Sequence, residues 1–466
     1  MSAVHNLHYE KFADGSVKCI KDEIPFDLPE GWAWERLSNL AAFSGGKTPS
    51  TSHLEYWGGD VLWITSKDMK SKYITSSQLR LSVLGAEQMQ IYQRDTLLLV
   101  TRSGILRHTL PVSILKECAT INQDLKAIVL HMPQLAEYIY SCLKAMEAQL
   151  LLKYTKSGTT VENVNFDEFQ KVLLPIPPTQ QIDRIISATG DAERVISTIE
   201  DDKAALAEYI VKAKAKILDL AIRGQLVPQD PADEPASVLL ERIRAEKEEL
   251  IRKGKIKRDK KESVIFRGED NSYYEKMADG KLHCLDNQLP FELPDGWEWC
   301  NLSMIGTTNI GLTYRPTDIE PGGIMVLRSC NIVNDQVDLS DLVRVKTAVR
   351  ENQFAQKNDI LICARNGSRS LVGKCALIPD LGEPASFGAF MAIYRTEYFE
   401  FIVHYLRSSF FRSVFDDSNS TAINQLTQDM LKRAIVPLPP LSEQRRIVEA
   451  IDAMLFELNQ IEKGLS

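Results

Sequence analysis

Mostly apolar residues recur at alternating spacings of three and four positions from Ile182 to Leu220, with Lys203 as a polar interruption. This period of about 3.5 residues is typical of a helix whose apolar stripe packs along another helix in a supercoil. The same spacing returns from Ile447 to Leu465. The two patterns predict long helices that pair in antiparallel orientation, and the first would measure roughly 58 Å at 1.5 Å rise per residue. The residues expected to form the helix-pairing seam are Ile182, Ile185, Ile196, Ile199, Leu206, Ile210, Ile217, Leu220, Ile447, Ile451, Met454 and Leu458.

Signals that end a helix follow the first pattern. Gly224 can adopt the left-handed cap conformation, and Pro228 prevents the helix from continuing. A second amphipathic helix over residues 237–252 leads into a basic run over 252–261. This run is either a solvated linker or a contact for phosphates or for an acidic partner.

Short apolar runs bounded by turn residues predict strands on both sides of the helical segment. These runs are 61–65, 96–101, 127–130 and 172–176 before it, and 324–328, 360–364, 391–394 and 434–438 after it. Residues 135–153 and 399–415 have helical patterns. Strands mixed with short helices predict an α/β fold of the α+β type.

The sequence also repeats itself. The segment LPEGWAW at 28–34 returns as LPDGWEW at 293–299, and VLLPIPP at 172–178 returns as AIVPLPP at 434–440. A duplicated unit of this size predicts two similar domains with similar sites. The expected organisation is a first domain over 1–178, a helical spacer and linker over 179–262, a second domain over 263–440 and a distal helix over 441–466.

Composition narrows the class of protein. With 44% hydrophobic and 25% charged residues among 466, the chain has a globular balance. It has no apolar run long enough to span a membrane, and its start is polar, so we expect a cytoplasmic protein with no membrane contact. The eight cysteines form no CxxC pair, which argues against a zinc site. The net charge of −8 suits a nucleic-acid binder only if positive charge gathers locally.

Polar residues follow predicted strands at equivalent places in the two halves. The loop at 65–68 corresponds to 328–331, and the loop at 101–104 corresponds to 364–367. Arg, Lys, Asn and Ser side chains at such positions can bind base edges and phosphates. One such loop is more commonly a plain surface turn, but the recurrence favours a shared DNA-binding role. The candidates are Lys47, Thr48, Ser66, Lys67, Asp68, Arg102, Ser103, Tyr314, Arg315, Arg328, Asn331, Arg365, Asn366, Ser368 and Arg369.

Catalytic patterns are missing from the sequence. SGGKT at 44–48 resembles the end of a phosphate-binding loop, but Ala41 stands where that motif requires glycine. The chain contains no GxSxG, no HExxH and no [ND]PP[YFW] tetrapeptide. We therefore expect a binding protein with no catalytic residues, no metal site and no cofactor of its own.

Several motifs together resemble the specificity subunits of type I restriction-modification systems. They are LPEGW at 28–32, GGKTPS at 45–50 with YWGGD at 56–60, the closing prolines of each repeat, and RGQLVPQD at 223–230. The resemblance covers nearly the whole chain. It implies two target recognition domains, separated by antiparallel helices, that each bind one half of a split sequence in double-stranded DNA. It also implies partners: two methyltransferase subunits carrying S-adenosylmethionine, and nuclease/translocase subunits that use ATP and Mg.

The distal helical pattern departs from this family arrangement because it covers far fewer residues than the central element, which leaves part of the predicted seam without a partner. Two other classes of function also stay open. A DNA methyltransferase or nuclease fragment with an unrecognised active site would modify DNA by itself. A protein-binding repeat scaffold would leave DNA modification unchanged when the loops of one domain are exchanged.

Overall fold

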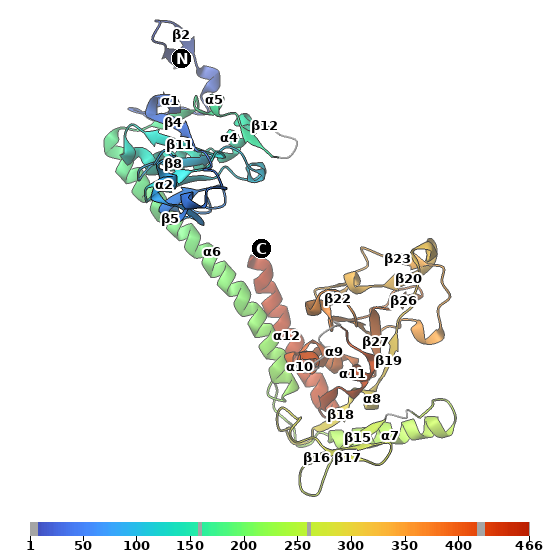
Figure 1. The fold of residues 1–466 in the computed structure, drawn as a ribbon. Coiled ribbons are helices and arrows are strands. Elements are labelled where there is room, and N and C mark those ends of the chain that lie inside the picture. The colour runs from blue at the N-terminus through green and yellow to red at the C-terminus, as the bar shows by residue number, and fades with distance from the viewer. Residues whose placement is uncertain (1–7, 157–160, 259–261, 417–424, 466) are drawn as a thin grey trace, which may run out of the picture. The chain divides into compact units, whose positions relative to one another are not determined.

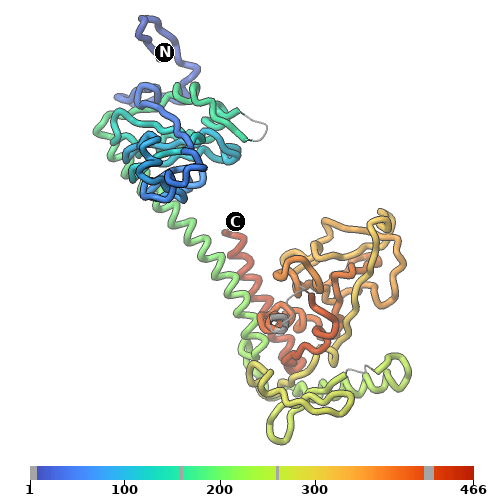
Figure 2. Tube along the Cα trace, viewed as in Figure 1, coloured from blue at the N-terminus to red at the C-terminus, as the bar shows by residue number. Residues whose placement is uncertain are grey.

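The computed structural model describes residues 8–156, 161–258, 262–416 and 425–465. The chain divides into two compact units, residues 1–200 and 201–466. The boundary falls inside α6 (Thr179–Ile222), a long helix that can be followed in Figures 1 and 2. This helix confirms the one predicted from the spacing of apolar residues. Among the described helices, none is both long enough and apolar enough to cross a membrane.

The first unit consists of short strands and helices around two sheets. Its strands are β1 (Tyr9–Lys11), β2 (Val17–Cys19), β3 (Ala33–Arg36), β4 (Ala41–Gly45), β5 (Trp57–Ile64), β6 (Tyr73–Ile74), β7 (Leu79–Leu81), β8 (Leu97–Val100), β9 (Val112–Leu115), β10 (Ala119–Ile121), β11 (Leu125–Leu130), β12 (Thr155–Lys156), β13 (Asn163–Val164) and β14 (Leu173–Ile176). Its helices before α6 are α1 (Leu37–Leu40), α2 (Val83–Ala86), α3 (Ala136–Ala145), α4 (Glu147–Tyr154) and α5 (Phe166–Phe169). The larger sheet has the strand order β4-β11-β8-β9-β6, and the smaller has the order β10-β5-β7.

The second unit repeats this plan. Its strands are β15 (Ser263–Arg267), β16 (Tyr273–Met277), β17 (Leu282–Cys284), β18 (Glu298–Asn301), β19 (Thr307–Ile310), β20 (Ile319–Leu327), β21 (Ile332–Val333), β22 (Gln336–Val337), β23 (Val343–Val345), β24 (Ile360–Cys363), β25 (Cys375–Leu377), β26 (Ala385–Phe387), β27 (Met391–Arg395) and β28 (Ile435–Leu438). Its helices are α7 (Ala236–Arg252), α8 (Leu302–Ile305), α9 (Phe399–Arg407), α10 (Ser409–Asp416), α11 (Gln428–Arg433) and α12 (Leu441–Leu465). The strand order β19-β27-β24-β25 corresponds to β4-β11-β8-β9 of the first unit, whose larger sheet has β6 as a fifth strand, and β26-β20-β23 corresponds to β10-β5-β7. The predicted α+β fold with two similar domains is confirmed.

Each of the two helices predicted inside the domains is broken in two. The first is interrupted at Met146, between α3 and α4. The second is interrupted at Ser408, whose backbone is extended with ψ 157°. The Ser408 hydroxyl accepts a hydrogen bond from the Phe411 N–H at 3.3 Å and so caps the start of α10. The apolar period alone does not reveal these breaks because both halves of each helix pack on the same core.

The first turns of α6 belong to the core of the first unit. Ile182 is buried there, and Ile185 packs against the same cluster, instead of lying in a seam between helices.

A network of charges holds the next turns of α6 to the domain. The Lys72 ammonium lies 3.0 Å from Glu193 on α6 and 3.4 Å from Glu137 on α3. Burial alone would lower the pKa of Lys72, but the two carboxylates raise it overall.

In the second unit α12 packs beside the end of α6 (Figure 1). Leu218 and Ile222 of α6 share a core cluster with Ile447 and Ile451 of α12, and Lys214 pairs with Glu462 at 2.6 Å. Later residues of α6 therefore meet earlier residues of α12, and the helices are antiparallel as predicted. Ile210 is buried and Ile217 contacts the cluster, whereas Leu220 and Leu458 are half-buried.

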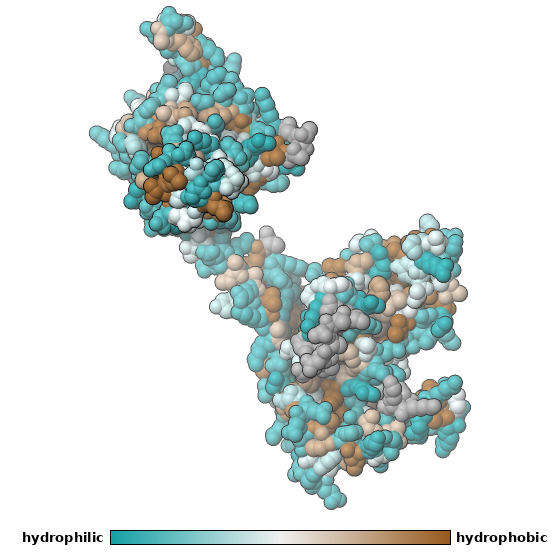
Figure 3. All heavy atoms as spheres, viewed as in Figure 1, coloured by the Kyte–Doolittle hydropathy of each residue, from teal (hydrophilic) through white to brown (hydrophobic). Residues whose placement is uncertain are grey.

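The predicted seam does not continue along the rest of α6. The side chains of Ile196, Ile199 and Leu206 are 56%, 54% and 40% exposed, and that of Met454 on α12 is 43% exposed. The structure therefore leaves apolar side chains on the surface of both helices. Figure 3 shows such apolar side chains among hydrophilic ones on the helical part of the chain.

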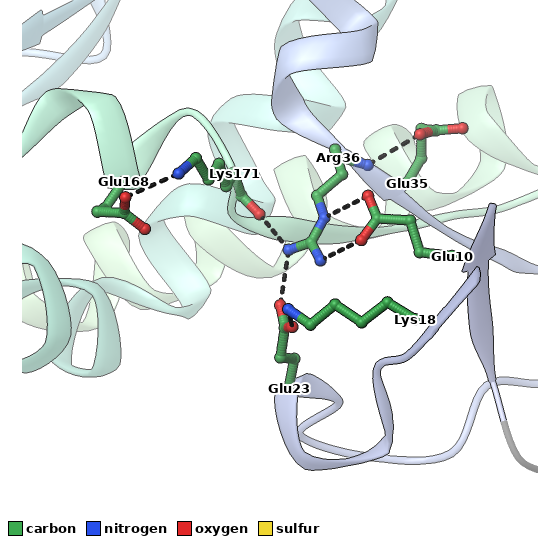
Figure 4. Close-up of polar contacts among 7 residues, drawn as sticks. All are labelled: Glu10, Lys18, Glu23, Glu35, Arg36, Glu168 and Lys171. Carbon is green, nitrogen blue, oxygen red and sulfur yellow. Dashed lines mark hydrogen bonds and ion pairs between the residues drawn. The ribbon is translucent and has the colours of Figure 1, made fainter. Parts of the chain in front are cut away.

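An arginine fastens the N-terminal hairpin to the first domain. Figure 4 shows the Arg36 guanidinium between Glu10 of β1 and Glu23, with a bidentate contact to Glu10 at 3.0 and 2.7 Å and a contact to Glu23 at 2.8 Å. Arg36 also donates to the Lys171 carbonyl at 2.6 Å. In the second unit Asn301 lies at the equivalent position and donates to Glu275, the counterpart of Glu10, at 3.3 Å. Both domains therefore fix their hairpins through the same pair of positions.

Arg36→Ala is expected to destabilise the first domain by about 2 kcal/mol at neutral pH, because it leaves two partly buried carboxylates without their cation. The Arg36 hydrogen bond lowers the pKa of Glu23 to about 2, although burial opposes that shift. The stabilisation is therefore present above the ordinary pKa of Glu23 and is lost as the pH falls toward 2. Thermal unfolding at pH 7 and pH 3 measures this effect.

The control for this prediction is Lys171→Ala. Lys171 forms an ion pair with Glu168 whose side chains are 59% and 53% exposed, so its loss should leave the melting temperature almost unchanged. Equal effects of the two substitutions at pH 7 would contradict the structural role assigned to Arg36.

Candidate nucleic-acid interface

Four loops meet at one edge of the first domain. Three of them follow a strand: residues 45–48 after β4, 65–68 after β5 and 101–104 after β8. The fourth, 122–124, connects β10 to β11. We call these residues the first loop edge. Because β10 runs parallel to β5, the two strands end at the same edge of the sheet. Backbone hydrogen bonds then join the loops, from Lys47 N to Ile121 O (3.1 Å), from Asn122 N to Ile64 O (3.0 Å) and from Thr101 N to Asp124 O (2.8 Å).

The second domain has an equivalent edge. Its loops are 311–315 after β19, 328–331 after β20, 364–367 after β24 and 388–390 between β26 and β27. We call these residues the second loop edge. The same three backbone bonds recur, from Leu312 N to Phe387 O (2.6 Å), from Gly388 N to Leu327 O (2.9 Å) and from Ala364 N to Phe390 O (2.9 Å). This register aligns the two edges residue by residue, so that Lys47 corresponds to Leu312 and Asp124 corresponds to Phe390.

A glycine makes this close approach possible in each domain. A β-carbon built on Gly46 would lie 2.0 Å from the Ile121 carbonyl oxygen, and one built on Gly311 would lie 2.2 Å from the Gly388 carbonyl oxygen. Neither distance is compatible with a side chain. The loop after the first strand of each sheet can therefore touch the 122–124 loop or its equivalent only through glycine.

Two of the predicted DNA-binding residues shape their own loops. The Asp68 carboxylate accepts the Thr65 N–H at 2.8 Å, and the Asn331 amide oxygen accepts the Arg328 N–H at 2.9 Å. Asn331 is fully buried, and its amide nitrogen donates to the Asp338 and Asp341 carbonyls at 2.8 Å each. These contacts favour a structural role for both side chains, because their polar atoms are already used.

Free positive charge gathers on the first loop edge. Lys47, Lys67 and Arg102 are exposed, and they form no ion pair with any residue in the described part of the chain. Ser66 is half-buried, and the Ser103 hydroxyl accepts the Ile105 N–H at 3.4 Å. The Thr48 hydroxyl donates to Gln123 across the edge. The first loop edge therefore offers three exposed cations around a hydrogen-bonded centre.

The second loop edge differs in its chemistry. The Arg328 side chain pairs with Asp341 at 2.9 Å, whereas the Arg365 guanidinium lies 5.5 Å from the centre of the Phe390 ring. The Asn366 amide donates to Ser329 at 3.5 Å, which links the 364–367 loop to the 328–331 loop.

Four further candidates lie on or beside the second edge. Tyr314 is half-buried against Leu312, Arg315 is exposed, Ser368 hydrogen-bonds Ser370 at 2.8 Å, and Arg369 begins a short exposed helical turn. The predicted residues of each domain therefore come from neighbouring loops of one edge.

The loops at 122–124 and 388–390 were missed by reasoning from the sequence. They lie at the centre of their edges, yet their letters, Asn-Gln-Asp and Gly-Ala-Phe, share nothing. These two loops contact their neighbours through backbone atoms, so comparing the side chains of the two halves of the sequence does not reveal them. In the first domain, the polar run 122–124 between two apolar segments is a sequence feature that could have indicated this loop.

Comparison with known proteins adds an independent finding. Residues 29–200 and 294–466 each match the type I restriction modification DNA specificity domain. The chain is 26% identical to the type I restriction enzyme EcoAI specificity subunit of Escherichia coli, over 95% of this chain and 80% of that protein. It is 33% identical to the StySPI specificity subunit of Salmonella potsdam, over 37% of this chain and 39% of that protein.

A solved structure has a similar fold. It comes from work on complex assembly and conformational transition of the type I R-M system, with a TM-score of 0.56 and 15% identity, over 95% of this chain and 94% of that one. At this identity the similarity concerns the fold alone.

Proposed function

The chain belongs to the family of type I restriction-modification specificity subunits, and on this premise we propose that each of its two domains reads one half of a split DNA sequence. Its relatives are specificity subunits, which have no catalytic activity of their own, and the chain is a non-catalytic DNA-recognition subunit like them. The proposed domain limits are those expected from the repeat: 1–178 and 263–440, with 179–262 as spacer and 441–466 as distal helix.

The observation that carries this proposal is the equivalence of the two loop edges. Each edge joins four loops through the same backbone hydrogen bonds, and each presents basic side chains, Arg102 in one domain and Arg365 in the other. Lysine and arginine can hold phosphates and set the register, and arginine can also bind guanine. Side chains at the centre of an edge can reach base edges in the major groove. We propose that DNA-binding side chains come from the predicted candidates on these edges, with Asp68 and Asn331 supporting the loops.

The exposed apolar side chains of the helices support a second part of the proposal. Val195, Ile196 and Ile199 on α6 are each more than half exposed, and Phe456 on α12 is 59% exposed. Contiguous apolar side chains of this kind favour a protein partner. We propose that the helices dock two methyltransferase subunits, which would bind S-adenosylmethionine and methylate adenine. Nuclease/translocase subunits using ATP and Mg would complete the restriction complex in the cytoplasm.

The central helix would also set the distance between half-sites. Half-sites that lie one turn of DNA apart are separated by roughly 34 Å, which the length predicted for the helix can accommodate. The contacts of Lys72 with Glu193 and Glu137 would fix the direction in which α6 leaves the first domain.

The purified chain alone is expected to bind its target DNA weakly, with a Kd near the nonspecific range of about 10⁻⁴ to 10⁻⁶ M at physiological salt. The reason is the net charge of −8, which opposes phosphate binding until partner subunits add positive surface. Fluorescence anisotropy with and without the methyltransferase subunit measures this difference.

A matched variant for this binding assay is Arg102→Ala. If Arg102 binds a phosphate, its removal should lower the slope of log K against log salt by about one in the complex. Tight, sequence-specific binding by the chain alone would contradict the expectation of weak binding.

A further inference from the structure

The loops at 122–124 and 388–390 occupy the centre of the two loop edges. Each contacts two of the other loops and the last residue of the strand, β5 or β20, that leads into the third. In the first domain the outer residues of this loop brace each other. The Asn122 amide donates to the Asp124 carboxylate at 3.1 Å, and the Asp124 N–H donates to Asn122 at 3.2 Å. Asn122 is buried, whereas Gln123 between them is exposed. The loop therefore presents one polar side chain, Gln123, to the outside.

The Gln123 side chain is held in a defined orientation. Its amide oxygen accepts a hydrogen bond from the Thr48 hydroxyl, which fixes the oxygen toward the 45–48 loop. Within the described residues the amide nitrogen donates to no acceptor, so both of its donors stay available, and the oxygen keeps a second lone pair. A glutamine amide can pair with the N6 and N7 atoms of adenine in the major groove, and such a pair needs one acceptor and one donor.

The second domain presents different chemistry at the same place. Ala389 and Phe390 replace Gln123 and Asp124, and the Phe390 ring is 61% exposed. The Arg365 backbone donates to the Phe390 carbonyl at 3.0 Å, and its guanidinium lies over the ring. Phenylalanine can contact the methyl group of thymine, and arginine can bind guanine through two hydrogen bonds.

We propose that these central loops determine base specificity, with Gln123 reading an adenine in one half-site, and Phe390 with Arg365 reading a thymine beside a guanine in the other. This inference rests on the proposed DNA-reading function and adds the residues and bases involved. The two half-sites are therefore read by different means on one scaffold: an oriented amide in the first domain, and an aromatic ring with a stacked guanidinium in the second.

Methylome sequencing of variants tests the proposal. The complete complex, with the methyltransferase subunit, would be expressed in a methylation-free host with Gln123→Ala or with Phe390→Ala. Each variant should lose its preference for the wild-type base at one or two positions of a single half-site. This preference should fall by about tenfold or more, while the bases read in the other half-site stay unchanged. Gln123→Glu should change the preference from adenine toward cytosine, because a carboxylate accepts from the cytosine amine.

Matched controls lie at the opposite end of the strands. Gln88→Ala removes another exposed glutamine of the first domain, and Ile319→Ala removes an exposed apolar side chain at the start of β20. Both should leave the motif unchanged.

A wild-type motif that persists in Gln123→Ala and Phe390→Ala would overturn the inference. Loss of all methylation by a soluble, assembled variant complex would also overturn it, because the loops would then supply affinity instead of base discrimination. Failure of the wild-type complex to produce any split motif would instead refute the proposed function itself.

Discussion

Introducing aspartate at two exposed positions of the central helix, Ile196→Asp with Ile199→Asp, is expected to abolish assembly with the methyltransferase subunits. The two side chains are 56% and 54% exposed and lie on one face of α6, three residues apart. If a partner covers this face, both carboxylates would be buried without a counter-charge, which costs several kcal/mol. Binding of the methyltransferase subunit should therefore fall by about 100-fold or more, as measured by titration or by co-purification.

The control places the same two charges on the opposite face of the same helical turn. Ser197→Asp with Thr198→Asp changes exposed residues that point away from the Ile196 and Ile199 side. This variant should assemble and methylate normally. Normal assembly of the Ile196→Asp, Ile199→Asp variant would show that the partners dock elsewhere.

Gly46→Ala is expected to disable the first domain. The new β-carbon would lie 2.0 Å from the Ile121 carbonyl oxygen, which belongs to the backbone of β10 and cannot move aside as a side chain can. The 45–48 loop would have to leave the 122–124 loop, at a cost of about 3 kcal/mol. We expect a lower melting temperature and loss of methylation at the split target, since both half-sites are needed.

Gly104→Ala provides the comparison within the same loop edge. A β-carbon at Gly104 meets no atom within 4 Å, so this substitution should leave the melting temperature unchanged. Gly311→Ala should reproduce the loss through the second domain, since its β-carbon would lie 2.2 Å from a backbone oxygen. Normal activity of Gly46→Ala would contradict the convergence of the four loops.

Much of the fold follows from local patterns in the sequence. The helix predicted over 182–220 is α6, and the one predicted over 237–252 is α7. The Gly224 cap has the expected positive φ of 67°. These features depend on apolar period, glycine and proline, which act over a few residues and can be recognised without knowledge of tertiary contacts.

The course of the helix seam could not be derived in the same way. Ile182 and Ile196 occupy equivalent places in the heptad pattern, but one lies in the first domain's core and the other is exposed. The pattern shows that a face is apolar and does not show which surface covers it. Strand β14 leads directly into α6, so the first turns of the helix pack on the domain, and α12 covers only the last turns.

The candidate DNA-binding site could be predicted only in part, because a local sequence pattern does not show which loops meet in the fold. Loops after strands β5 and β8 could be proposed because polar letters recur there in both halves. The loops at 122–124 and 388–390 meet them only through the parallel pairing of β10 with β5 and of β26 with β20. That pairing joins segments far apart in the chain and is specified by backbone bonds, so the sequence alone does not place Gln123 or Phe390 at the centre of an edge.

The measurement that tests the central claim most directly is single-molecule methylome sequencing of a methylation-free host that expresses this chain with its methyltransferase subunit. Hosts that lack either protein serve as controls. The account predicts a split, adenine-methylated motif that appears only when both proteins are present, with one half-site for each domain. A continuous motif, a motif made by this chain alone, or no motif despite a soluble complex would contradict it.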